Sequence, residues 1–325
     1  MQGWYCETLN GPQGLAWREC PTPEPGRGEV RVAIRAASLN FPDLLIVQGK
    51  YQAKPALPFV PGSEYAGVVE AVGPEVATLQ PGDAVAVIGT HGGFATHAIA
   101  SANSALKLPA GFALEDGAAF AFTYGTAHHA LVDRAQLRAG ETVLVLGAAG
   151  GVGSAAIQVA KAMGAKVIAA ASSDDKCAFC RSLGADATLD YSTQDLRKAL
   201  EQLTAGKGPD AVFDPVGGDL AEPALRAIAW RGRYLVIGFA QGAIPALPWN
   251  LPLLKGASIV GVFWGSFVRH EPAQSARALA ELARWYGEGK IKPAIDQRLP
   301  LRELPRAFAR MASRKVQGKL LLVNA

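Results

Sequence analysis

A cluster of glycines lies between an apolar run and a helix-like repeat, and this order is typical of a nucleotide-binding turn. Residues 143–146 are apolar and include β-branched valines, which favours a buried parallel strand. From Val152 onward, apolar residues recur at helical spacing as far as Gly164, which stands where a helix cap belongs. The sequence therefore predicts a strand, a glycine turn and a helix.

The predicted turn has the chemistry to bind a pyrophosphate. A helix N-terminus presents unpaired N–H groups and a partial positive charge, and both attract anions. An anion can approach these groups closely where no side chain blocks the way. Residues 148–153, AAGGVG, match the dinucleotide fingerprint G-x-G-x-x-G with one substitution, and we expect Gly150, Gly151 and Val152 at the cofactor. Tight packing of a helix on a strand also requires small residues, so the motif alone leaves that interpretation open.

The end of the next predicted strand, residues 166–171, indicates which dinucleotide fits. An NAD site normally has an acidic residue about 20 residues after the glycines, where it binds the ribose 2′-hydroxyl. Ala171 occupies this place and neutral Ser172 and Ser173 follow, while Lys176 lies one helical turn further on, where its charge would attract a 2′-phosphate. The sequence therefore favours NADPH over NADH.

Two aspartates leave a preference for NADH open. Asp174 and Asp175 directly follow Ser173. Either carboxylate could accept the ribose hydroxyls of NADH, but acidic residues at a helix start also complement the helix dipole without any ligand.

Length, composition and charge narrow the class of protein. The chain has 325 residues, which is enough for two domains, and half of them are hydrophobic. No apolar run reaches about 18 residues, so we expect no membrane span. The net charge is only +4 without a basic block, so nucleic-acid binding is not indicated. The first residues have neither the basic nor the apolar region of a secretory signal.

The four cysteines favour reduced thiols and a cytoplasmic location. Cys177 and Cys180 form a C-x-x-C pair inside a predicted helix. A redox or metal pair is one interpretation, but no second ligand pair lies nearby, which favours two ordinary cysteines on a helix face.

The pattern of the chain changes near residue 125. Before it, short apolar runs alternate with Pro and Gly turns, which favours a β-rich barrel or sandwich. After it, strands alternate with helices, which predicts an α/β fold with a doubly wound parallel sheet. Its six strands are expected near 143–146, 166–171, 187–190, 210–214, 233–238 and 257–263. The pattern leaves open to which domain the following helix, extended segment, helix and strand belong.

Seven segments, in order along nearly the whole chain, resemble the medium-chain dehydrogenase/reductase superfamily, and within it the zinc-independent NADPH:quinone oxidoreductases. They are AASLNFPDLLIVQGKY, PFVPGSEYAGVVEAVG, QPGDAVAVIG, FTYGTAHHAL, GAAGGVG, FDPVGG and RKVQGKLLLVN. The resemblance implies a GroES-like (chaperonin-10-like) catalytic domain formed by residues 1–124 and 262–325, and a six-stranded Rossmann domain formed by residues 125–261. It also implies an active-site cleft between the domains and a homodimer joined through residues 257–265.

The resemblance also bears on metal binding. Zinc-containing relatives have a cysteine ligand where this chain has Asn40, and Gly-His-Glu where it has residues 62–64, Gly-Ser-Glu. They also carry a lobe of four cysteines, whereas residues 84–107 contain none. Zinc requires three or four suitable ligands in one place, so we expect no metal site.

Without a Lewis acid, the hydride acceptor must already be electrophilic. Quinones and α,β-unsaturated carbonyls meet this requirement, whereas a simple alcohol would lack an activator. The resemblance implies an NADPH-dependent oxidoreductase that transfers hydride to a small-molecule quinone, with the proton coming from solvent or Tyr51. A C=C reductase of enones or enoyl thioesters is the alternative enzyme. A non-catalytic NADPH-binding protein is the alternative from another class.

The resemblance assigns roles to residues near the reacting atoms. Asn40 would direct its amide toward the nicotinamide ribose or the substrate oxygen, and Thr126 would contact the nicotinamide amide or ribose. Tyr51 would line the pocket and donate a hydrogen bond, although an aromatic residue in a loop core is an equal interpretation. Leu45 replaces another pocket tyrosine of the family, which makes the pocket more apolar and weakens the case for an acid supplied by the protein.

The resemblance also assigns the remaining cofactor contacts. Ser172, Lys176 and Tyr191 would hold the 2′-phosphate and flank the adenine, with a plain surface charge as the alternative for Lys176. Arg314 and Lys319 resemble C-terminal cations that reach back to the phosphates. The positions expected along the nicotinamide half are Val216, Gly238, Phe239, Phe263 and Gly265.

Overall fold

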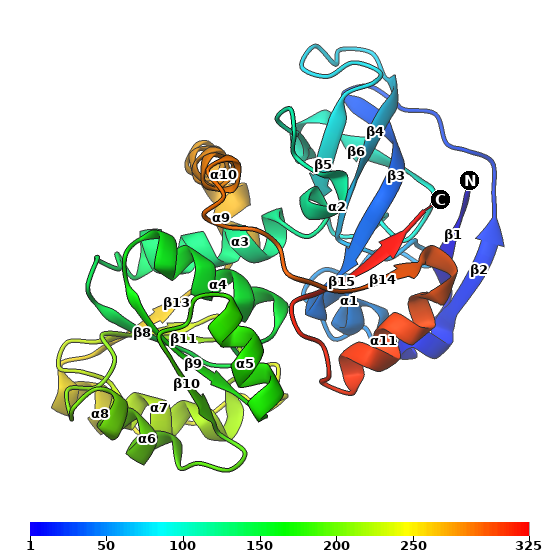
Figure 1. Cartoon of the computed structure of the whole chain (residues 1–325). Helices are drawn as coiled ribbons and strands as arrows, with labels where there is room; N and C mark the ends of the chain where they lie inside the picture. Colours follow the sequence, from blue (N-terminus) through cyan, green and yellow to red (C-terminus); the bar gives the residue numbers. More distant parts are fainter. Residues whose placement is uncertain (325) are drawn as a thin grey trace. The chain divides into compact units, whose positions relative to one another are not determined.

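The strands and helices predicted for the middle of the chain form a six-stranded parallel sheet (Figure 1). Its strands are β8 (Thr142–Val145), β9 (Lys166–Ala171), β10 (Ala187–Asp190), β11 (Ala211–Asp214), β12 (Arg233–Val236) and β13 (Ser258–Gly261). Their order across the sheet is β10-β9-β8-β11-β12-β13, so the chain reverses direction across the sheet at β8. This is the strand order of a dinucleotide-binding Rossmann sheet, and the predicted fold class is confirmed.

Helices cover both faces of this sheet. They are α3 (Ala121–His128), the π-helix η3 (His129–Arg134), α4 (Gly151–Ala162), α5 (Asp174–Ser182), the short η4 (Gly218–Leu220), α6 (Leu196–Leu203), α7 (Ala221–Ala227), α8 (Asn250–Lys255), α9 (Trp264–His270) and α10 (Pro272–Gly287). Leu144, Ile168 and Val212 share a buried cluster with residues of α6, α7 and α8, whereas α3 and α4 lie on the other face (Figure 1). Because both faces are covered, the strands are almost purely apolar.

A second sheet is formed from both ends of the chain. Its strands are β3 (Glu29–Leu39), β4 (Glu64–Val72), β5 (Ala84–Ile88), β6 (His97–Ser101), β7 (Ala105–Lys107), β14 (Ile295–Pro300) and β15 (Lys319–Val323). Their order is β14-β15-β3-β4-β5-β7, and β6 also pairs with β3. An added Cβ at Gly67 of β4 would lie 2.0 Å from the carbonyl oxygen of Ala33, so the close approach of β3 and β4 requires glycine.

Further elements close the core of this β-rich part. They are β1 (Gln2–Cys6), η1 (Gly11–Gly14), β2 (Leu15–Glu19), α1 (Phe41–Val47), η2 (Ala102–Ser104), α2 (Leu114–Gly117), η5 (Leu301–Glu303) and α11 (Leu304–Ala312). Phe308 of α11 packs edge-to-face on Phe94, with ring centroids 6.3 Å apart, and both side chains are fully buried among the apolar residues of the sheet. The predicted β-rich, GroES-like part is therefore present.

The computed structural model describes residues 1–324, and contacts divide them into two units. Unit 1 comprises residues 1–122 and the segment from Ile295 onward, and unit 2 comprises residues 123–294. Residues 262–294 lie in unit 2, whereas the resemblance implied that they belong to the catalytic domain, and the boundary is corrected accordingly. None of the helices in the described part of the chain combines the length and apolar character that a membrane crossing requires.

Packing of α9 and α10 on α3 explains the corrected boundary. An added Cβ at Gly125 would lie 2.6 Å from the Trp264 ring, so α3 and the start of α9 touch. The ring of His129 stacks on Phe267 with centroids 4.1 Å apart. His128 Nε2 lies 3.0 Å from a carboxylate oxygen of Glu281 in α10. These contacts hold residues 264–287 to the unit that contains α3.

An ion pair joins the amino ends of β8 and β12. Arg233 donates through Nη1 and Nη2 to the two oxygens of Glu141, at 3.0 and 2.6 Å, and the N–H of Arg138 donates to the same carboxylate at 2.8 Å. Burial alone would raise the pKa of Glu141. The donated hydrogen bonds and the positive charge of Arg233 outweigh burial and hold this pKa below its usual value.

We predict that Glu141→Gln lowers the melting temperature at pH 7 by about 2–4 °C, because about 1 kcal/mol of partly screened interaction is lost. A carboxyl whose pKa is lowered by folding stabilises the protein above its unfolded pKa, and this contribution disappears as the pH falls through the folded pKa. Wild type and variant should therefore converge between about pH 5 and pH 3. Thermal unfolding across this range measures the difference.

Glu222→Gln is the matched control for this prediction, because the pair of Glu222 with Arg226 is more exposed and lies within one helix. It should change the melting temperature less than Glu141→Gln. A difference between wild type and Glu141→Gln that stays constant from pH 7 to pH 3 would contradict the assigned role of the ion pair.

Candidate functional site

The glycine turn follows β8 and leads into α4. Gly150 caps the helix, and its N–H donates to the carbonyl oxygen of Gly147 at 3.0 Å. An added Cβ at Gly153 would lie 2.5 Å from that oxygen and 2.7 Å from Cα of Ala148, so Gly153 serves helix packing. A Cβ at Gly150 would meet only the Gly147 oxygen, at 3.4 Å. Packing does not explain Gly150, and open space at this position fits the close approach of a ligand.

The first turn of α4 has the features of an anion site. Gly151 and Val152 begin the helix, where N–H groups have no acceptor within the helix and carry the positive end of its dipole. An added Cβ at Gly147, whose φ is +57°, would lie 2.7 Å from the side chain of Val216. The turn after β11 therefore lies against the glycine turn after β8, beside the point where the strand order reverses.

The residues predicted for the adenosine end are brought together at the carboxyl ends of β9 and β10. Lys176 Nζ donates to Ser172 Oγ at 2.8 Å, and the N–H of Lys176 donates to Ser173 Oγ at 3.3 Å. The N–H of Tyr191 donates to the carbonyl oxygen of Ala171 at 3.0 Å, which places Tyr191 beside the end of β9. Tyr191 also lines a surface hollow of about 310 Å³.

The neighbouring acidic and thiol residues lie on α5. Asp174 and Asp175 are exposed in its first turn, where their charges complement the helix dipole. Cys177 and Cys180 are buried on the inner face, and burial raises the pKa of both thiols, that of Cys180 to about 12. Neither cysteine is an activated thiol.

A buried carboxylate shapes the turn after β11. Asp214 Oδ1 accepts hydrogen bonds from the N–H of Val216 and of the residue after it, both at 2.8 Å, and Oδ2 accepts one from the Tyr234 hydroxyl at 2.6 Å. The N–H of Gly238 lies 3.3 Å from the Asp214 carbonyl oxygen, and Phe239 follows, half-buried. These contacts bring Val216, Gly238 and Phe239 to one end of the sheet.

The last predicted residues of unit 2 gather around Trp264. The Trp264 ring is buried against Gly125. Thr126, which follows Gly125 in α3, is buried as well. Phe263 directly precedes α9 and half of its surface is exposed. A Cβ at Gly265 would lie 3.5 Å from the Phe263 ring, so the phenyl group covers the start of α9. Thr126, Phe263 and Gly265 therefore belong to one neighbourhood.

In unit 1, Asn40 lies in a buried polar cluster between β3 and α1. Its Oδ1 accepts a hydrogen bond from Lys319 Nζ at 2.5 Å. Its Nδ2 lies 3.2 Å from both Ser38 Oγ and Glu64 Oε2. The amide that we predicted to face the ribose or the substrate is therefore held by side chains of β3, β4 and β15.

Lys319 has a different environment from the one predicted. Its side chain is only 4% exposed, and its ammonium group contacts Asn40 Oδ1 and, at 3.1 Å, Glu64 Oε2. A cation held by two buried acceptors does not reach out to a phosphate, so we revise its role to support of Asn40. Arg314, the other predicted cation, lies just after α11 with φ of +58° and is exposed.

Glu64 is the functional candidate that the sequence analysis missed. It is fully buried, and its Oε2 receives Ser38 Oγ at 2.6 Å in addition to Asn40 and Lys319, while Oε1 receives the N–H of Phe122 at 2.8 Å. One signal was present in the sequence. Glu64 and Lys319 each begin an apolar strand, and charged residues are rarely buried unless they are paired.

A second buried carboxylate fixes the start of α1. Asp43 accepts hydrogen bonds from the N–H of Asn40 at 2.7 Å and of Ser63 at 3.0 Å. Burial raises the pKa of Asp43 to about 6, against the lowering effect of these bonds and of Lys319. Tyr51 packs partly buried against the core, and burial together with the charge of Asp43 raises the pKa of its phenol. Tyr51 therefore carries its proton at neutral pH.

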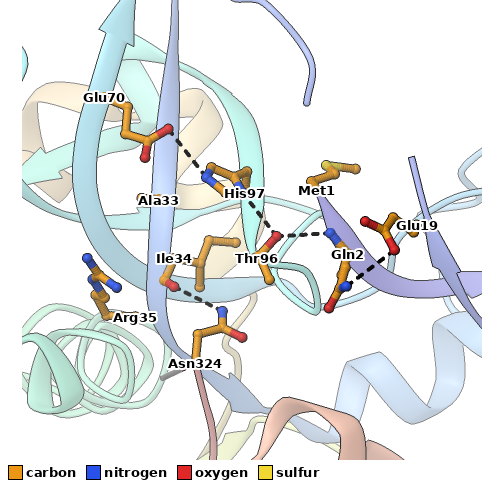
Figure 2. A pocket seen from close by; sticks show the side chains of 10 residues that line it. All are labelled: Met1, Gln2, Glu19, Ala33, Ile34, Arg35, Glu70, Thr96, His97 and Asn324. Atoms are coloured by element: carbon orange, nitrogen blue, oxygen red, sulfur yellow. Dashed lines mark hydrogen bonds and ion pairs between the residues drawn. The ribbon is translucent and has the colours of Figure 1, made fainter. Parts of the chain in front are cut away.

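A surface hollow of about 350 Å³ lies elsewhere in unit 1 (Figure 2). Figure 2 shows that its polar side chains bind one another: His97 Nε2 lies 3.3 Å from Glu70, and Thr96 Oγ1 accepts the N–H of Gln2 at 3.0 Å. None of the predicted site residues lines this hollow, so it is separate from the candidate site.

Comparison with known proteins agrees with both units. Residues 26–110 match the family model described as the alcohol dehydrogenase GroES-like domain, and residues 151–283 match the one described as zinc-binding dehydrogenase. Quinone oxidoreductase-like protein 2 of Bos taurus is 40% identical over 93% of this chain and 87% of its own length. Quinone oxidoreductase of Pseudomonas aeruginosa is 37% identical over 96% of each chain. The structure of Escherichia coli quinone oxidoreductase complexed with NADPH aligns with a TM-score of 0.92 at 29% identity, covering all of both chains.

The zinc named by one family model does not fit the residues present. At the positions where the zinc-containing relatives have a cysteine and a histidine, the chain offers the amide of Asn40 and the hydroxyl of Ser63, which are poor zinc ligands. The Lys319 ammonium lies 2.5 Å from Asn40 and 3.1 Å from Glu64, so a cation already neutralises the carboxylate that contacts the Asn40 side-chain amide.

The family of this chain follows from its fold, its strand order, the glycine turn after β8 and its relatives over nearly the whole chain. The relatives exceed 30% identity over nearly the whole chain, and both family models match in the expected order. The chain belongs to the quinone oxidoreductase family of the medium-chain dehydrogenase/reductase superfamily, and it is an oxidoreductase of that superfamily.

Proposed function

We propose that this protein is an NADPH-dependent, zinc-independent reductase that transfers hydride to a quinone. The observation that carries the proposal is the carboxyl edge of the parallel sheet in unit 2. There the open glycine turn, the Ser172–Lys176 pair and the Asp214-shaped turn lie at the ends of adjacent strands. Ligands of open α/β sheets bind at this edge, beside the reversal of strand order.

Residues of unit 2 would hold the cofactor along this edge. The first turn of α4, at Gly150, Gly151 and Val152, would bind the pyrophosphate through backbone N–H groups. Ser172 and Lys176 would bind the 2′-phosphate, and Tyr191 would flank the adenine. The positions proposed for the nicotinamide half are Thr126, Val216, Gly238, Phe239, Phe263 and Gly265. We retain Arg314 of unit 1 as a proposed phosphate contact.

The proposed chemistry requires little from the protein beyond placement. Bound NADPH supplies the hydride. Asn40 would orient the ribose or the acceptor oxygen, and Tyr51, which keeps its proton at neutral pH, would donate a hydrogen bond to the acceptor. A quinone needs no Lewis acid, in keeping with the residues around Asn40. Four free thiols, Cys6, Cys20, Cys177 and Cys180, support a cytoplasmic location.

A panel of acceptors tests the proposed reaction. With NADPH as donor, we expect the greatest kcat/KM with a quinone, lower values with enones and enoyl thioesters, and activity that survives removal of metal by a chelator. A greater kcat/KM with an enone would assign C=C reduction instead. Tight NADPH binding without oxidation by any acceptor would identify a non-catalytic binding protein, and stoichiometric zinc in the purified protein would refute the zinc-independent assignment.

Lys176→Ala tests the choice of cofactor. Loss of a charge-assisted contact to the 2′-phosphate should weaken NADPH binding by on the order of tenfold, at about 1.4 kcal/mol per decade. NADH lacks this phosphate and should bind within about twofold of wild type. Fluorescence titration of both cofactors measures this. Lys166→Ala at the amino end of β9 is the control and should leave both affinities unchanged. Equal losses for the two cofactors, or a wild-type preference for NADH, would refute the assignment.

A homodimer joined through β13 is also proposed. Within the described chain β13 is an edge strand, paired only with β12, and the preceding α8 exposes the apolar side chains of Leu253 and Leu254. Ser258 and Val262 donate their N–H groups toward the β12 side, so the N–H of Ile259 faces away from it.

Ile259→Pro should convert the dimer to a monomer, because proline removes an N–H needed for pairing at the edge. Light scattering coupled to size-exclusion chromatography measures the mass. Leu203→Glu replaces an exposed leucine of α6 and should leave the dimer intact. A monomeric wild type would refute the proposed dimer.

A further inference from the structure

The side-chain amide of Asn40 has one allowed orientation in its cluster. As it stands, Oδ1 faces the Lys319 ammonium at 2.5 Å and Nδ2 faces the Glu64 carboxylate at 3.2 Å. Reversing the amide would place an NH₂ group against an ammonium and a carbonyl oxygen against a carboxylate. Both contacts would then be repulsive, since an ammonium only donates and an ionised carboxylate only accepts. The two charges therefore select the orientation.

Glu64 has to be a carboxylate for this arrangement. Its Oε2 collects three donors, from Ser38 at 2.6 Å, Lys319 at 3.1 Å and Asn40 at 3.2 Å. An amide NH₂ in place of Oε2 would oppose the donors of Asn40 and Lys319. Oε1 accepts the N–H of Phe122 at 2.8 Å, in the first turn of α3. The same carboxylate thus binds Asn40 and the backbone of Phe122, both in unit 1.

Lys319 supplies the balancing charge. Among residues 1–324 it is the cation paired with Glu64, and both side chains are almost completely buried, at 4% and 0% exposure. An isolated buried charge is strongly destabilising, so neither group is tolerated alone. A neutral pair would also satisfy burial. Burial alone therefore does not explain why this pair is charged.

We propose that Glu64 and Lys319 are positioning residues of the reductase, which fix the Asn40 amide with its oxygen toward β15 and so set the geometry for hydride transfer. The inference rests on the proposed function for its catalytic consequence. The orientation itself is a property of the protein without cofactor. A reversed amide would present a donor where the native side chain presents an acceptor, and misplaced contacts at a reacting centre lower kcat more than they lower cofactor affinity.

The informative variant is the neutral pair Glu64→Gln/Lys319→Met. It leaves no unpaired buried charge, so it should melt close to wild type, whereas Lys319→Met alone should melt markedly lower. The glutamine introduced by Glu64→Gln can still accept the N–H of Phe122 through its amide oxygen. Its NH₂ group then faces Asn40, which should reverse so that Oδ1 accepts. The double variant therefore tests orientation without a loss of the fold.

Three measurements read out the result. The side-chain amide ¹⁵N–¹H signals of Asn40 in the protein without cofactor should shift and exchange faster with solvent in the double variant. When NADPH is titrated into the double variant, the fluorescence emission of the bound nicotinamide should differ from that in wild type. The Kd for NADPH should stay within about threefold of the wild-type value. The kcat with the best acceptor should fall by on the order of tenfold or more, which is a barrier increase of about 1.4 kcal/mol per decade.

Arg310→Met/Asp296→Asn is the matched control. This pair also lies in unit 1, is joined by two hydrogen bonds of 2.6 and 2.9 Å, and links α11 to β14. Its neutralisation should leave the Asn40 signals, the nicotinamide emission and kcat unchanged. Effects of similar size in the control would overturn the proposal, because any neutralised ion pair would then have the same consequence.

The outcomes separate this inference from the proposed function. Unchanged Asn40 signals in the double variant would overturn the orienting role, and shifted signals with wild-type nicotinamide emission and kcat would overturn the positioning role. If none of the acceptors tested oxidises NADPH in the presence of the wild-type protein, the proposed function fails. The amide signals and the nicotinamide emission then still decide whether the charges orient Asn40 toward bound NADPH.

Discussion

The carboxylate of Glu64 is buried without access to water, and unit 1 is arranged to compensate for its charge. Removing an ion of this kind from water costs several kcal/mol even after the protein relaxes. The compensating groups, Ser38 and Asn40, Phe122, and Lys319, come from three segments that are distant in the sequence. Within unit 1, strands β3 and β15, the start of α1 and the backbone of Phe122 therefore meet at one carboxylate.

Local patterns predicted the nucleotide-binding sheet well. The expected strands 166–171 and 187–190 have the observed bounds of β9 and β10, and the glycine turn and the six-stranded parallel sheet are confirmed. Each of these features depends on neighbouring residues, such as an apolar run, a glycine with positive φ or a helix cap. The contact of Lys176 with Ser172 is also local, because one helical turn separates them.

The features that were missed depend on partners far apart in the chain. Glu64 and Lys319 are separated by 255 positions, and no period or spacing connects them. Helical periodicity left open which domain residues 262–294 join, because it predicts an apolar face but not the surface that it meets, and the boundary implied by the resemblance differs from the observed one. The stacking of His129 on Phe267 and the contact of the Trp264 ring with Gly125 show that this segment packs on α3. Sequence reasoning thus predicted residues that gather at one edge of the sheet in unit 2, and it missed the support of Asn40 in unit 1.

The construction of unit 1 from both chain ends has a consequence for synthesis on the ribosome. Strand β3 and Glu64 emerge early, whereas β15, which pairs with β3 and carries Lys319, emerges only after all of unit 2. Until then residues 36–39 of β3 lack their partner strand and the charge of Glu64 lacks its cation. Unit 2 is a continuous segment and can fold while the ribosome is still at work, since domains fold as units as they emerge. Residues translated after all of unit 2 therefore complete a sheet that was begun before it, and the nascent chain carries an incompletely paired strand throughout the synthesis of unit 2.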